Sequence, residues 1–227
     1  MQHNDLLETM RQACAPVGLV TVPERHGAYR NCFKRIFDML AVVLTSVVVV
    51  PLVAILAVVL AMEGHKPFYV SERVGRGGRP FRMLKLRTMV DDADDQLADY
   101  LERNAHARSE WEKTQKLKSD PRITAVGHFL RKSSLDELPQ LWNIFVGDMS
   151  LVGPRPMMPC QRAMYPGLSY YGLRPGLTGP WQISSRNDVG FSQRSEFDGQ
   201  YDDQLSLGTD VRILLKTVGA VLRGTGY

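Results

Sequence analysis

Two adjacent carboxylates, Asp136 and Glu137, stand in the segment RKSSLDELPQLWNIFVGDMSLVGPRP, between a basic pair and an apolar stretch. Two local interpretations are open. In one, Ser134 caps a helix and Glu137 reaches back to it as a capping box. In the other, the helix begins at Pro139 and the acids occupy the turn ahead of its N-terminus, where negative charge and phosphate are both favoured. Residue chemistry alone allows a structural or a catalytic role for these acids.

Several cations are candidates for binding an anionic substrate. Lys85 and Arg87 in FRMLKLRTM are separated by one residue, so on a strand they would share one face and form a clamp for a diphosphate. Arg155 lies between two prolines, which restrict the backbone and hold its guanidinium on a stiff stem. The other candidates are Arg131, Arg174 and Arg186. For each cation, a structural turn or a solvated face is the alternative.

The composition argues against several other chemistries. The chain has 227 residues, of which 44% are hydrophobic and 23% charged, a balance typical of globular proteins. Its cysteines are few and scattered, which favours reduced thiols on the cytoplasmic side over a disulfide framework. The histidines lack the spacing of a zinc or haem site. A net charge of +4 suits an anionic partner but is too small to indicate nucleic acid.

An apolar run from Met39 to Met62 contains no charged residue. As a helix it would be about 36 Å long, enough to cross a bilayer core. A helix of this size in a soluble protein normally carries a polar face, so we predict that the run lies in the membrane. Pro51 removes a backbone hydrogen bond near its middle and predicts a kink. Thr45 and Ser46, one turn earlier, are available to satisfy the freed backbone groups.

Basic residues flank this run on both sides, so the positive-inside tendency does not select one orientation. A helix bent at Pro51 that enters and leaves the cytoplasmic face would satisfy both flanks. Each arm would reach only about 18 Å, which is too short to span the bilayer. We therefore predict a re-entrant helix, with a proline-kinked spanning helix as the alternative.

The remaining sequence predicts short elements. Phe68–Val70 and Phe81–Leu86 have the composition of strands, and the flexible segment VGRGGRP joins them. The stretch DDADDQLADYLERNAHARSEWEKTQKLK predicts one amphipathic helix, whose first acids offset the helix dipole better than they would hold a metal. Gly208 to Asp210 predicts the cap of a last helix, which would stop at Gly224 and pack on the domain or lie on the bilayer surface.

These elements divide the chain into three predicted parts. Residues 1–29 form an N-terminal extension with a peripheral helix near 6–14. Residues 30–66 form the membrane-associated helix with its kink at Pro51. Residues 67–227 form a small cytoplasmic catalytic domain. The fold class is α+β and mainly helical, with amphipathic interfacial helices beside the re-entrant helix.

Taken together, these stretches resemble the bacterial sugar transferases, which are monotopic phosphoglycosyl transferases. The similarity runs in one order: KRIFD before the proline-containing apolar run, then FRMLKLRTM, then the stretch from SDPRITAVGHFL to VGPRP, then LRPGLTGPWQISSRND. It extends from Lys34 to the C-terminus, and the block Leu130 to Pro156 is its most specific part.

The resemblance implies a reaction. Asp136 would be the nucleophile and Glu137 its partner in a catalytic dyad. Attack on the sugar-linked phosphorus of a UDP-sugar would release UMP and leave an aspartyl-phosphosugar, and polyprenyl (undecaprenyl) phosphate would then take the sugar phosphate. The family uses Mg²⁺ beside the dyad aspartate. It places phosphate- and nucleotide-binding cations at the positions of Lys85, Arg87, Arg131 and Arg155.

The resemblance also implies a location, the cytoplasmic face of the bacterial inner membrane, with a re-entrant helix bent at its proline. Family members often have serine directly before that proline, whereas Val50 stands here and Ser46 lies one turn earlier. The chain resembles a minimal form without the extra spanning helices of larger members. Its ending is similar to exopolysaccharide-initiating members, which favours galactose or glucose, although no residue pattern reads a hydroxyl configuration.

The expected partners are a UDP-sugar, polyprenyl phosphate and membrane lipid, but not nucleic acid. The sequence leaves the oligomeric state open, with a homodimer as one candidate. The alternative function is a non-catalytic membrane adaptor that binds anionic lipid through its basic flanks. Such an adaptor has no need of paired acids beside a proline-fixed arginine, which is why we favour the enzyme.

Overall fold

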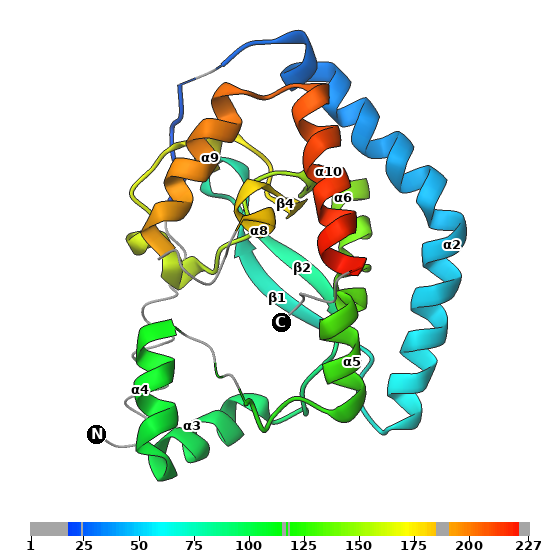
Figure 1. Cartoon of the computed structure of the whole chain (residues 1–227), viewed down its shortest axis with the longest axis vertical. Coiled ribbons are helices and arrows are strands. Elements are labelled where there is room, and N and C mark those ends of the chain that lie inside the picture. The colour runs from blue at the N-terminus through cyan, green and yellow to red at the C-terminus, as the bar shows by residue number, and fades with distance from the viewer. Residues whose placement is uncertain (1–17, 24, 115–116, 118, 185–190, 223–227) are drawn as a thin grey trace.

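The computed structural model describes residues 18–23, 25–114, 117, 119–184 and 191–222 of the chain. The predicted helix near residues 6–14, Arg186 and the expected stop at Gly224 lie outside these ranges. The described part is mainly helical, with two small two-stranded sheets (Figure 1). The predicted mainly helical α+β class is therefore confirmed.

One long apolar helix dominates the N-terminal part. A π-helical turn, η1 (Tyr29–Phe33), continues without a break into α2 (Lys34–Met62). In length and composition this helix is able to cross a membrane, with a mean hydropathy of 3.0 and 6% burial in its most apolar window. It bends along one side of the domain, with both ends turned toward the rest of the molecule (Figure 1). It continues through Pro51 rather than ending there.

The hydroxyl groups before Pro51 do not act as expected. The Thr45 hydroxyl donates to the carbonyl of Ala41 at 2.7 Å, and the Ser46 hydroxyl donates to that of Val43 at 2.7 Å. Both bonds run back along the helix, as is usual for hydroxyl side chains inside helices. They therefore do not reach the carbonyl of Val47, which loses its partner to the proline.

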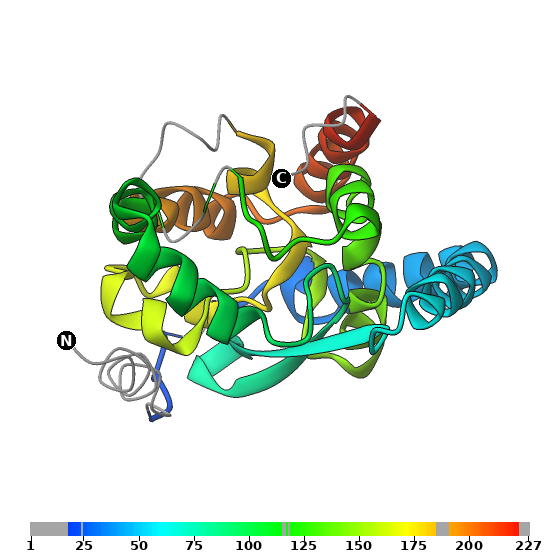
Figure 2. The ribbon, with the colours of Figure 1, turned by 90° about the horizontal axis from the view of Figure 1, so that it is seen from below.

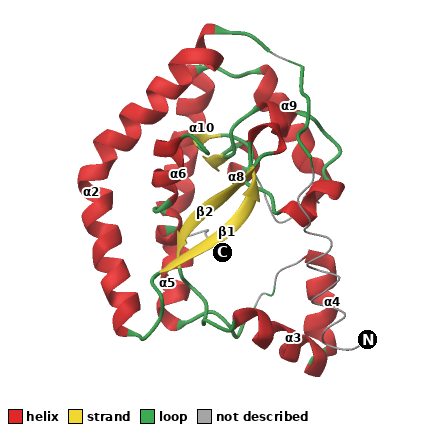
Figure 3. Cartoon of the chain, turned by 180° about the vertical axis from the view of Figure 1, so that it is seen from behind, coloured by secondary structure: helices red, strands yellow, loops and turns green. Residues whose placement is uncertain are grey.

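An antiparallel hairpin crosses the middle of the molecule (Figure 3). It consists of β1 (Phe68–Val74) and β2 (Pro80–Leu86), with Phe68 opposite Leu86 and Val74 opposite Pro80. Both predicted strands are confirmed, and the first is longer than expected. The connecting turn contains η2 (Arg76–Gly78), where Gly77 has a φ of 68°, a left-handed conformation that favours glycine.

The amphipathic stretch after the hairpin forms two helices, α3 (Ala93–Arg103) and α4 (Ala105–Thr114), instead of the single predicted helix. The chain is extended at Asn104, with φ −130° and ψ 98°. The Asn104 side chain accepts a hydrogen bond from the amide of Ala107 at 3.1 Å and so caps the second helix. Apolar residues of both helices then pack in one small cluster that includes Leu97 and Ala107. A straight helix would not bring these residues together.

The rest of the domain is built from short elements around a shared core. In chain order these are α5 (Ala125–Ser133), η3 (Leu135–Glu137), α6 (Gln140–Val146), β3 (Ser150–Val152), η4 (Pro159–Met164), α7 (Ser169–Gly172), β4 (Gly176–Thr178), α8 (Pro180–Ile183), η6 (Phe191–Gln193), α9 (Arg194–Asp203) and α10 (Leu207–Leu222). Strands β3 and β4 are parallel. The main core joins residues of α2, β2, α6, β3, α9 and α10, and includes Ile144 and Val152, both fully buried.

The last helix begins earlier than its predicted cap. Gly208 to Asp210 lie in the first turn of α10, and the Ser206 hydroxyl ahead of them accepts a bond from the amide of Thr209 at 3.2 Å. Asp210 is not used as a cap because its side chain is 0% exposed and bonds to other helices. The prediction was wrong because the cap and the buried acid are different residues.

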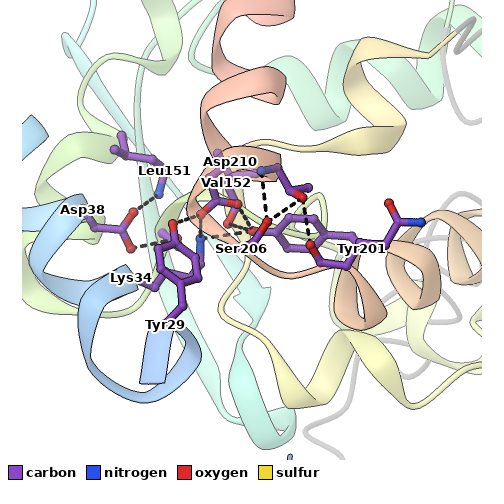
Figure 4. Close-up of polar contacts among 11 residues, drawn as sticks. Tyr29, Lys34, Asp38, Leu151, Val152, Tyr201, Ser206 and Asp210 are labelled. Carbon is purple, nitrogen blue, oxygen red and sulfur yellow. Dashed lines mark hydrogen bonds and ion pairs between the residues drawn. The ribbon is translucent and has the colours of Figure 1, made fainter. Parts of the chain in front are cut away.

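The carboxylate of Asp210 joins α2 to the rest of the domain (Figure 4). The ammonium of Lys34 lies 2.7 Å from it in a buried ion pair. The hydroxyls of Tyr29 and Tyr201 each donate to the same carboxylate at 2.6 Å. Since a buried charge is tolerated only when it is paired and hydrogen-bonded, these four residues fix the start of α2 on α9 and α10.

Two further contacts hold α2. One turn beyond Lys34, the 1% exposed Asp38 accepts hydrogen bonds from the Ser150 hydroxyl at 2.8 Å and from the Leu151 amide at 3.1 Å. At the opposite end, Leu60 packs in an apolar cluster with Leu86 and Leu130. Both ends of α2 are therefore attached to one domain, while its middle is left exposed.

Replacing Lys34 by Met should destabilise the protein by about 3–5 kcal/mol, because Asp210 would keep a buried charge without its cation. Thermal unfolding in detergent micelles measures the change. Lys132→Met, at an exposed position on α5, is the matched control and should leave the Tm unchanged. The double variant Lys34→Met/Asp210→Asn should recover part of the loss. Equal Tm values for the wild type and Lys34→Met would contradict the role of this ion pair.

Candidate active site

The adjacent acids lie in a tight turn between two helices. Helix α5 ends at Ser134, which has a φ of 57°, and this left-handed residue turns the chain into η3 (Leu135–Glu137). The Ser134 side chain makes no capping hydrogen bond, so the predicted capping box does not form. Helix α6 starts after Pro139. The second interpretation is therefore confirmed: the acids stand ahead of a helix N-terminus.

Lys85 lies between the two carboxylates. Its Nζ is 2.7 Å from Oε1 of Glu137 and 3.6 Å from Oδ2 of Asp136. Asp136 is only 8% exposed. Lys85 of β2 and the two acids of η3 thus form one charged cluster. The sequence indicated this grouping only through the family resemblance.

The environment of Asp136 opposes its ionisation. Burial raises the pKa of the Asp136 carboxyl above its usual range, and the Glu137 carboxylate raises it further, although Lys85 and Arg131 act in the opposite direction. An additional cation beside the carboxyl would lower its pKa and favour the charged, nucleophilic form. The site is thus suited to a carboxylate that becomes fully active when more positive charge arrives.

Asn143 holds the strand that carries Lys85. Its side-chain oxygen accepts a hydrogen bond from the amide of Leu84 at 2.9 Å, and its side-chain nitrogen donates to the carbonyl of Arg82 at 2.7 Å. The amide of Asn143 therefore replaces a neighbouring strand along this edge of β2 and fixes β2 against α6. Sequence reasoning missed this residue, although an asparagine within the apolar stretch LWNIFV was the available signal.

Arg131 approaches the dyad from α5. Its Nε donates to the Thr88 hydroxyl at 2.9 Å. Burial lowers the pKa of Arg131, and the negative charge of Asp136 opposes that shift. The contact needs Gly127, because a Cβ at that position would lie 2.1 Å from the carbonyl oxygen of Thr88. The structure thus brings Arg131 near the acids, as its place in the sequence suggested.

Arg87 follows directly after β2, which ends at Leu86, and its backbone amide still donates to the carbonyl of Pro67 across the hairpin. Its guanidinium lies 5.8 Å from the ring centre of Tyr69, the residue opposite Lys85, so both cations lie beside Tyr69. The Nε of Arg87 donates to the carbonyl of Lys66 at 2.8 Å, and one of its terminal nitrogens lies 3.0 Å from the carboxylate of Asp91. The clamp and a role for Arg87 in substrate binding both stay predictions.

Two glycine-rich motifs place Arg155 and Arg174. A Cβ at Gly176 would lie 2.1 Å from the amide nitrogen of Gly153, so the two backbones approach closely only because both residues are glycine. Beyond them, the guanidinium of Arg155 lies 5.9 Å from the ring centre of Trp181. Arg174 points elsewhere, with its Nε donating to the carbonyl of Gly147 at 3.0 Å.

Sequence reasoning did not identify two further arginines, Arg73 and Arg194. The guanidinium of Arg194 lies 4.1 Å from the ring centre of Trp181 and 4.3 Å from that of Phe191. Burial lowers the pKa of Arg194 to about 10, and the charges of Arg155 and Arg73 lower it as well. No motif marked Arg73 or Arg194, because they are far apart in the sequence and interact only in the folded chain.

The acids fit a magnesium ion that takes its remaining ligands from the phosphates of the substrate and from water. The described residues contain no group of three or more His, Cys, Asp or Glu side chains suited to a metal. Mg²⁺, however, prefers hard oxygen ligands and commonly takes one or two carboxylates together with phosphates and water. Because Glu137 is engaged by Lys85, Asp136 is the better protein ligand.

Comparison with known proteins gives the family. Residues 29–224 match the model of the bacterial sugar transferase family, and the chain belongs to this family. The ExoY exopolysaccharide production protein of Rhizobium meliloti is 44% identical over 211 residues, which are 90% of this chain and 93% of that protein. The UDP-galactose-lipid carrier transferase of Erwinia amylovora is 47% identical over 195 residues, 85% of this chain.

These relatives differ in length. The match covers 41% of the Erwinia amylovora protein, and likewise 41% of the undecaprenyl-phosphate galactose phosphotransferase of Salmonella typhimurium, which is 45% identical over 195 residues and 85% of this chain. The chain thus spans about two fifths of these longer relatives but nearly all of ExoY. Residues 29–224, which the family model matches, contain the acids, the hairpin and all of α2.

Asp198 should make the stability of the protein depend on pH. It is buried and accepts a hydrogen bond from the Tyr165 hydroxyl at 2.9 Å, and burial raises its pKa to about 7. Because the folded state then holds a proton that the unfolded chain releases near pH 4, stability should fall as the pH rises from about 4 to about 7. Asp198→Asn should remove this pH dependence, which amounts to about 4 kcal/mol of unfolding free energy between pH 4 and pH 7.

Unfolding of the wild type and of Asp198→Asn in detergent, at a series of pH values, measures this difference. Subtracting the two curves removes the contribution of other titrating groups, including Asp136. Parallel curves between pH 4 and 7 would contradict the raised pKa of Asp198.

Proposed function

We propose that this chain transfers a sugar 1-phosphate from a UDP-sugar to undecaprenyl phosphate, giving undecaprenyl-diphosphate-sugar and UMP. The observation that carries the proposal is the buried Asp136, grouped with Glu137 and Lys85 on a domain attached to both ends of an exposed apolar helix. Lys85 and the nearby Arg131 supply positive charge for a diphosphate beside the acids, and α2 is an anchor at the surface where a lipid carrier lies. The names of the relatives support the first membrane step of exopolysaccharide or a related glycan synthesis.

In the first half-reaction, a carboxylate oxygen of Asp136 attacks the sugar-linked phosphorus of the donor. A bond forms between this oxygen and phosphorus, while the bond from phosphorus to the bridging oxygen of the diphosphate breaks. UMP leaves with that electron pair. Lys85 and Arg131 offset the negative charge that gathers when a carboxylate meets a diphosphate.

In the second half-reaction, an oxygen of undecaprenyl phosphate attacks the same phosphorus and displaces the Asp136 carboxylate. Splitting the transfer in this way allows a water-soluble donor and a lipid acceptor to use one site in turn. Glu137 orients Lys85 through their 2.7 Å contact and is placed to support Asp136. A Mg²⁺ ion held by Asp136 would polarise the phosphoryl oxygens and favour the ionised carboxylate.

The attachment of α2 supports a re-entrant helix rather than a spanning one. Lys34 at its start and Leu60 near its end both contact the same domain, so both ends belong on one side of the bilayer. Between them, Leu44 and Val47 are 76% and 78% exposed, as expected for a bend that dips into lipid. We infer that the domain lies on the cytoplasmic face of the bacterial inner membrane, where UDP-sugars are available.

Other helices add apolar surface to this anchor. On α6, Trp142 is 60% exposed and stacks on Phe145, and on α10 the exposed Leu215 and Val218 lie three residues apart. Exposed apolar residues at such spacing on an amphipathic helix are typical of contact with the headgroup region. We propose that α6 and α10 rest on the bilayer beside α2. The sugar is proposed to be galactose, in line with the names of two relatives, with glucose as the alternative.

Asp136→Asn should abolish UMP release from a UDP-sugar in membranes that contain polyprenyl phosphate, because the amide is a poor nucleophile. Wild-type protein incubated with donor alone should gain the mass of one sugar phosphate, and the variant should not. Glu137→Gln should retain the adduct but reduce turnover by about 10²-fold. Asp99→Asn, at an exposed acid on α3, is the control and should behave as wild type. Full activity of Asp136→Asn would refute the nucleophile.

The same assay separates the enzyme from the adaptor that the sequence left as an alternative. The adaptor would bind anionic vesicles, yet show neither UMP release nor a dependence on Mg²⁺. A panel of UDP-sugars in this assay also identifies the sugar. Turnover with UDP-galactose alone would settle the choice.

The re-entrant path predicts that both flanks of α2 react from the cytoplasmic side. In a variant whose natural cysteines are replaced by serine, cysteines at the exposed positions Thr21 and Glu72 should both react with an impermeant maleimide in inverted vesicles. Neither should react in intact spheroplasts. Reaction of either cysteine from outside would establish a helix that crosses the membrane.

A further inference from the structure

Two guanidinium groups from separate elements lie beside Trp181 on α8, and the charge of a third arginine, Arg73, interacts with both. Arg194 of α9 and Arg155 of the loop after β3 lie 4.1 Å and 5.9 Å from the centre of its ring. The pKa of Arg73 on β1 is lowered first by burial and then by the nearby positive charge of Arg155. Like charges are brought together here at a cost in electrostatic energy, which needs an explanation.

The cluster offers hydrogen-bond donors without acceptors. Among the described residues, the Nε atoms of Arg73 and Arg194 and the Nε1 of Trp181 are buried and have no hydrogen-bond partner. Each buried donor left unpaired costs about 1–3 kcal/mol. The carboxylate that acts on Arg194 is Asp198, which already accepts the Tyr165 hydroxyl and carries a pKa of about 7. Positive charge therefore exceeds negative charge in this cluster.

A phosphate group would remove both costs. It carries the missing negative charge, and its several acceptor oxygens match the planar fork of an arginine. Three arginines from different elements can surround such an anion. A neutral or cationic ligand would leave their charges unbalanced. The chemistry of the cluster thus points to a phosphate-containing ligand.

The cluster lies on the same face of the hairpin as Lys85. Lys85 pairs with Tyr69 across the hairpin, and Tyr69 and Arg73 share one face of β1 because they are four residues apart. The strand distance between these positions is about 14 Å, so one extended ligand is long enough to reach from the acids toward the arginines. In Figure 1, and again in the view of Figure 2, α9 lies across the domain from the exposed middle of α2, the part proposed to enter the lipid. A ligand beside α9 is therefore on the side of the domain away from that part of α2.

We propose that Arg73, Arg155 and Arg194, together with Trp181, bind the nucleoside monophosphate part of the sugar donor and hold it as the leaving group. This inference rests on the proposed function and adds to it the residues that receive the nucleotide. Arg73 and Arg194 are its new substrate-binding residues. The phosphate of the lipid carrier has the same chemistry, so the test must separate the two sources.

The test measures UMP binding to the full-length protein in detergent by isothermal titration calorimetry. Arg73→Gln and Arg194→Gln should each weaken UMP binding by about tenfold or more, as expected for the loss of a charge-assisted hydrogen bond. Arg194→Lys should weaken it as well, because the charge remains but the fork is lost. Arg103→Gln, at an exposed arginine on α3, is the matched control and should bind as wild type.

Three results would overturn the inference: wild-type protein that does not bind UMP, unchanged UMP affinity in both Arg73→Gln and Arg194→Gln, or variants that lose affinity for a short-chain polyprenyl phosphate and keep it for UMP. If Arg194→Gln fails to fold, UMP binding by Arg73→Gln and Arg194→Lys tests the proposed site. Because UMP binding does not require the nucleophile, Asp136→Asn should bind UMP normally. Failure of the covalent mechanism and failure of this site are therefore distinguishable.

Discussion

The buried ion pair of Lys34 and Asp210 ties the membrane helix to the catalytic domain, and much of the molecule is arranged around that joint. Lys34 and its neighbour Arg35 are the last two cations before the apolar run, whereas Asp210 lies on α10, the last helix of the described residues. Their contact, with the hydroxyls of Tyr29 and Tyr201, means that α2 cannot pivot freely. Since Leu60 holds the opposite end, the helix must curve, and its apolar middle faces away from the domain.

The attachment of both ends of α2 also keeps the candidate active site close to this helix. The hairpin that carries Lys85 begins six residues after α2 ends, at Phe68, and Leu86 at its far end packs on Leu60. The acids of η3 follow Leu130, which belongs to the same cluster. The carboxylate of Asp136, the proposed nucleophile, is thus held near the end of α2, the helix proposed to enter the bilayer.

Charge is unbalanced at two places in this arrangement, the acids and the arginines. Burial disfavours the charge on Asp136, and the positive charges of Arg73, Arg155 and Arg194 repel one another. Both imbalances are relieved by ligands of opposite sign, a divalent cation at the acids and phosphates at the arginines. A site that is strained without its substrates and balanced with them suits a reaction in which two anionic substrates must approach one carboxylate.

The sequence by itself determined the apolar helix, the hairpin strands and the family, since each depends on residues close together in the chain. It left two interpretations around Pro139 open, and the structure decided for the turn. The break at Asn104 and the early start of α10 were not predictable, because side chains from elsewhere decide them. Only the tertiary structure joined Lys85 to the acids, Asn143 to the strand edge, and Arg73 to Arg194. Local patterns record backbone preferences, whereas these contacts arise when distant segments bury their charges and polar groups against one another.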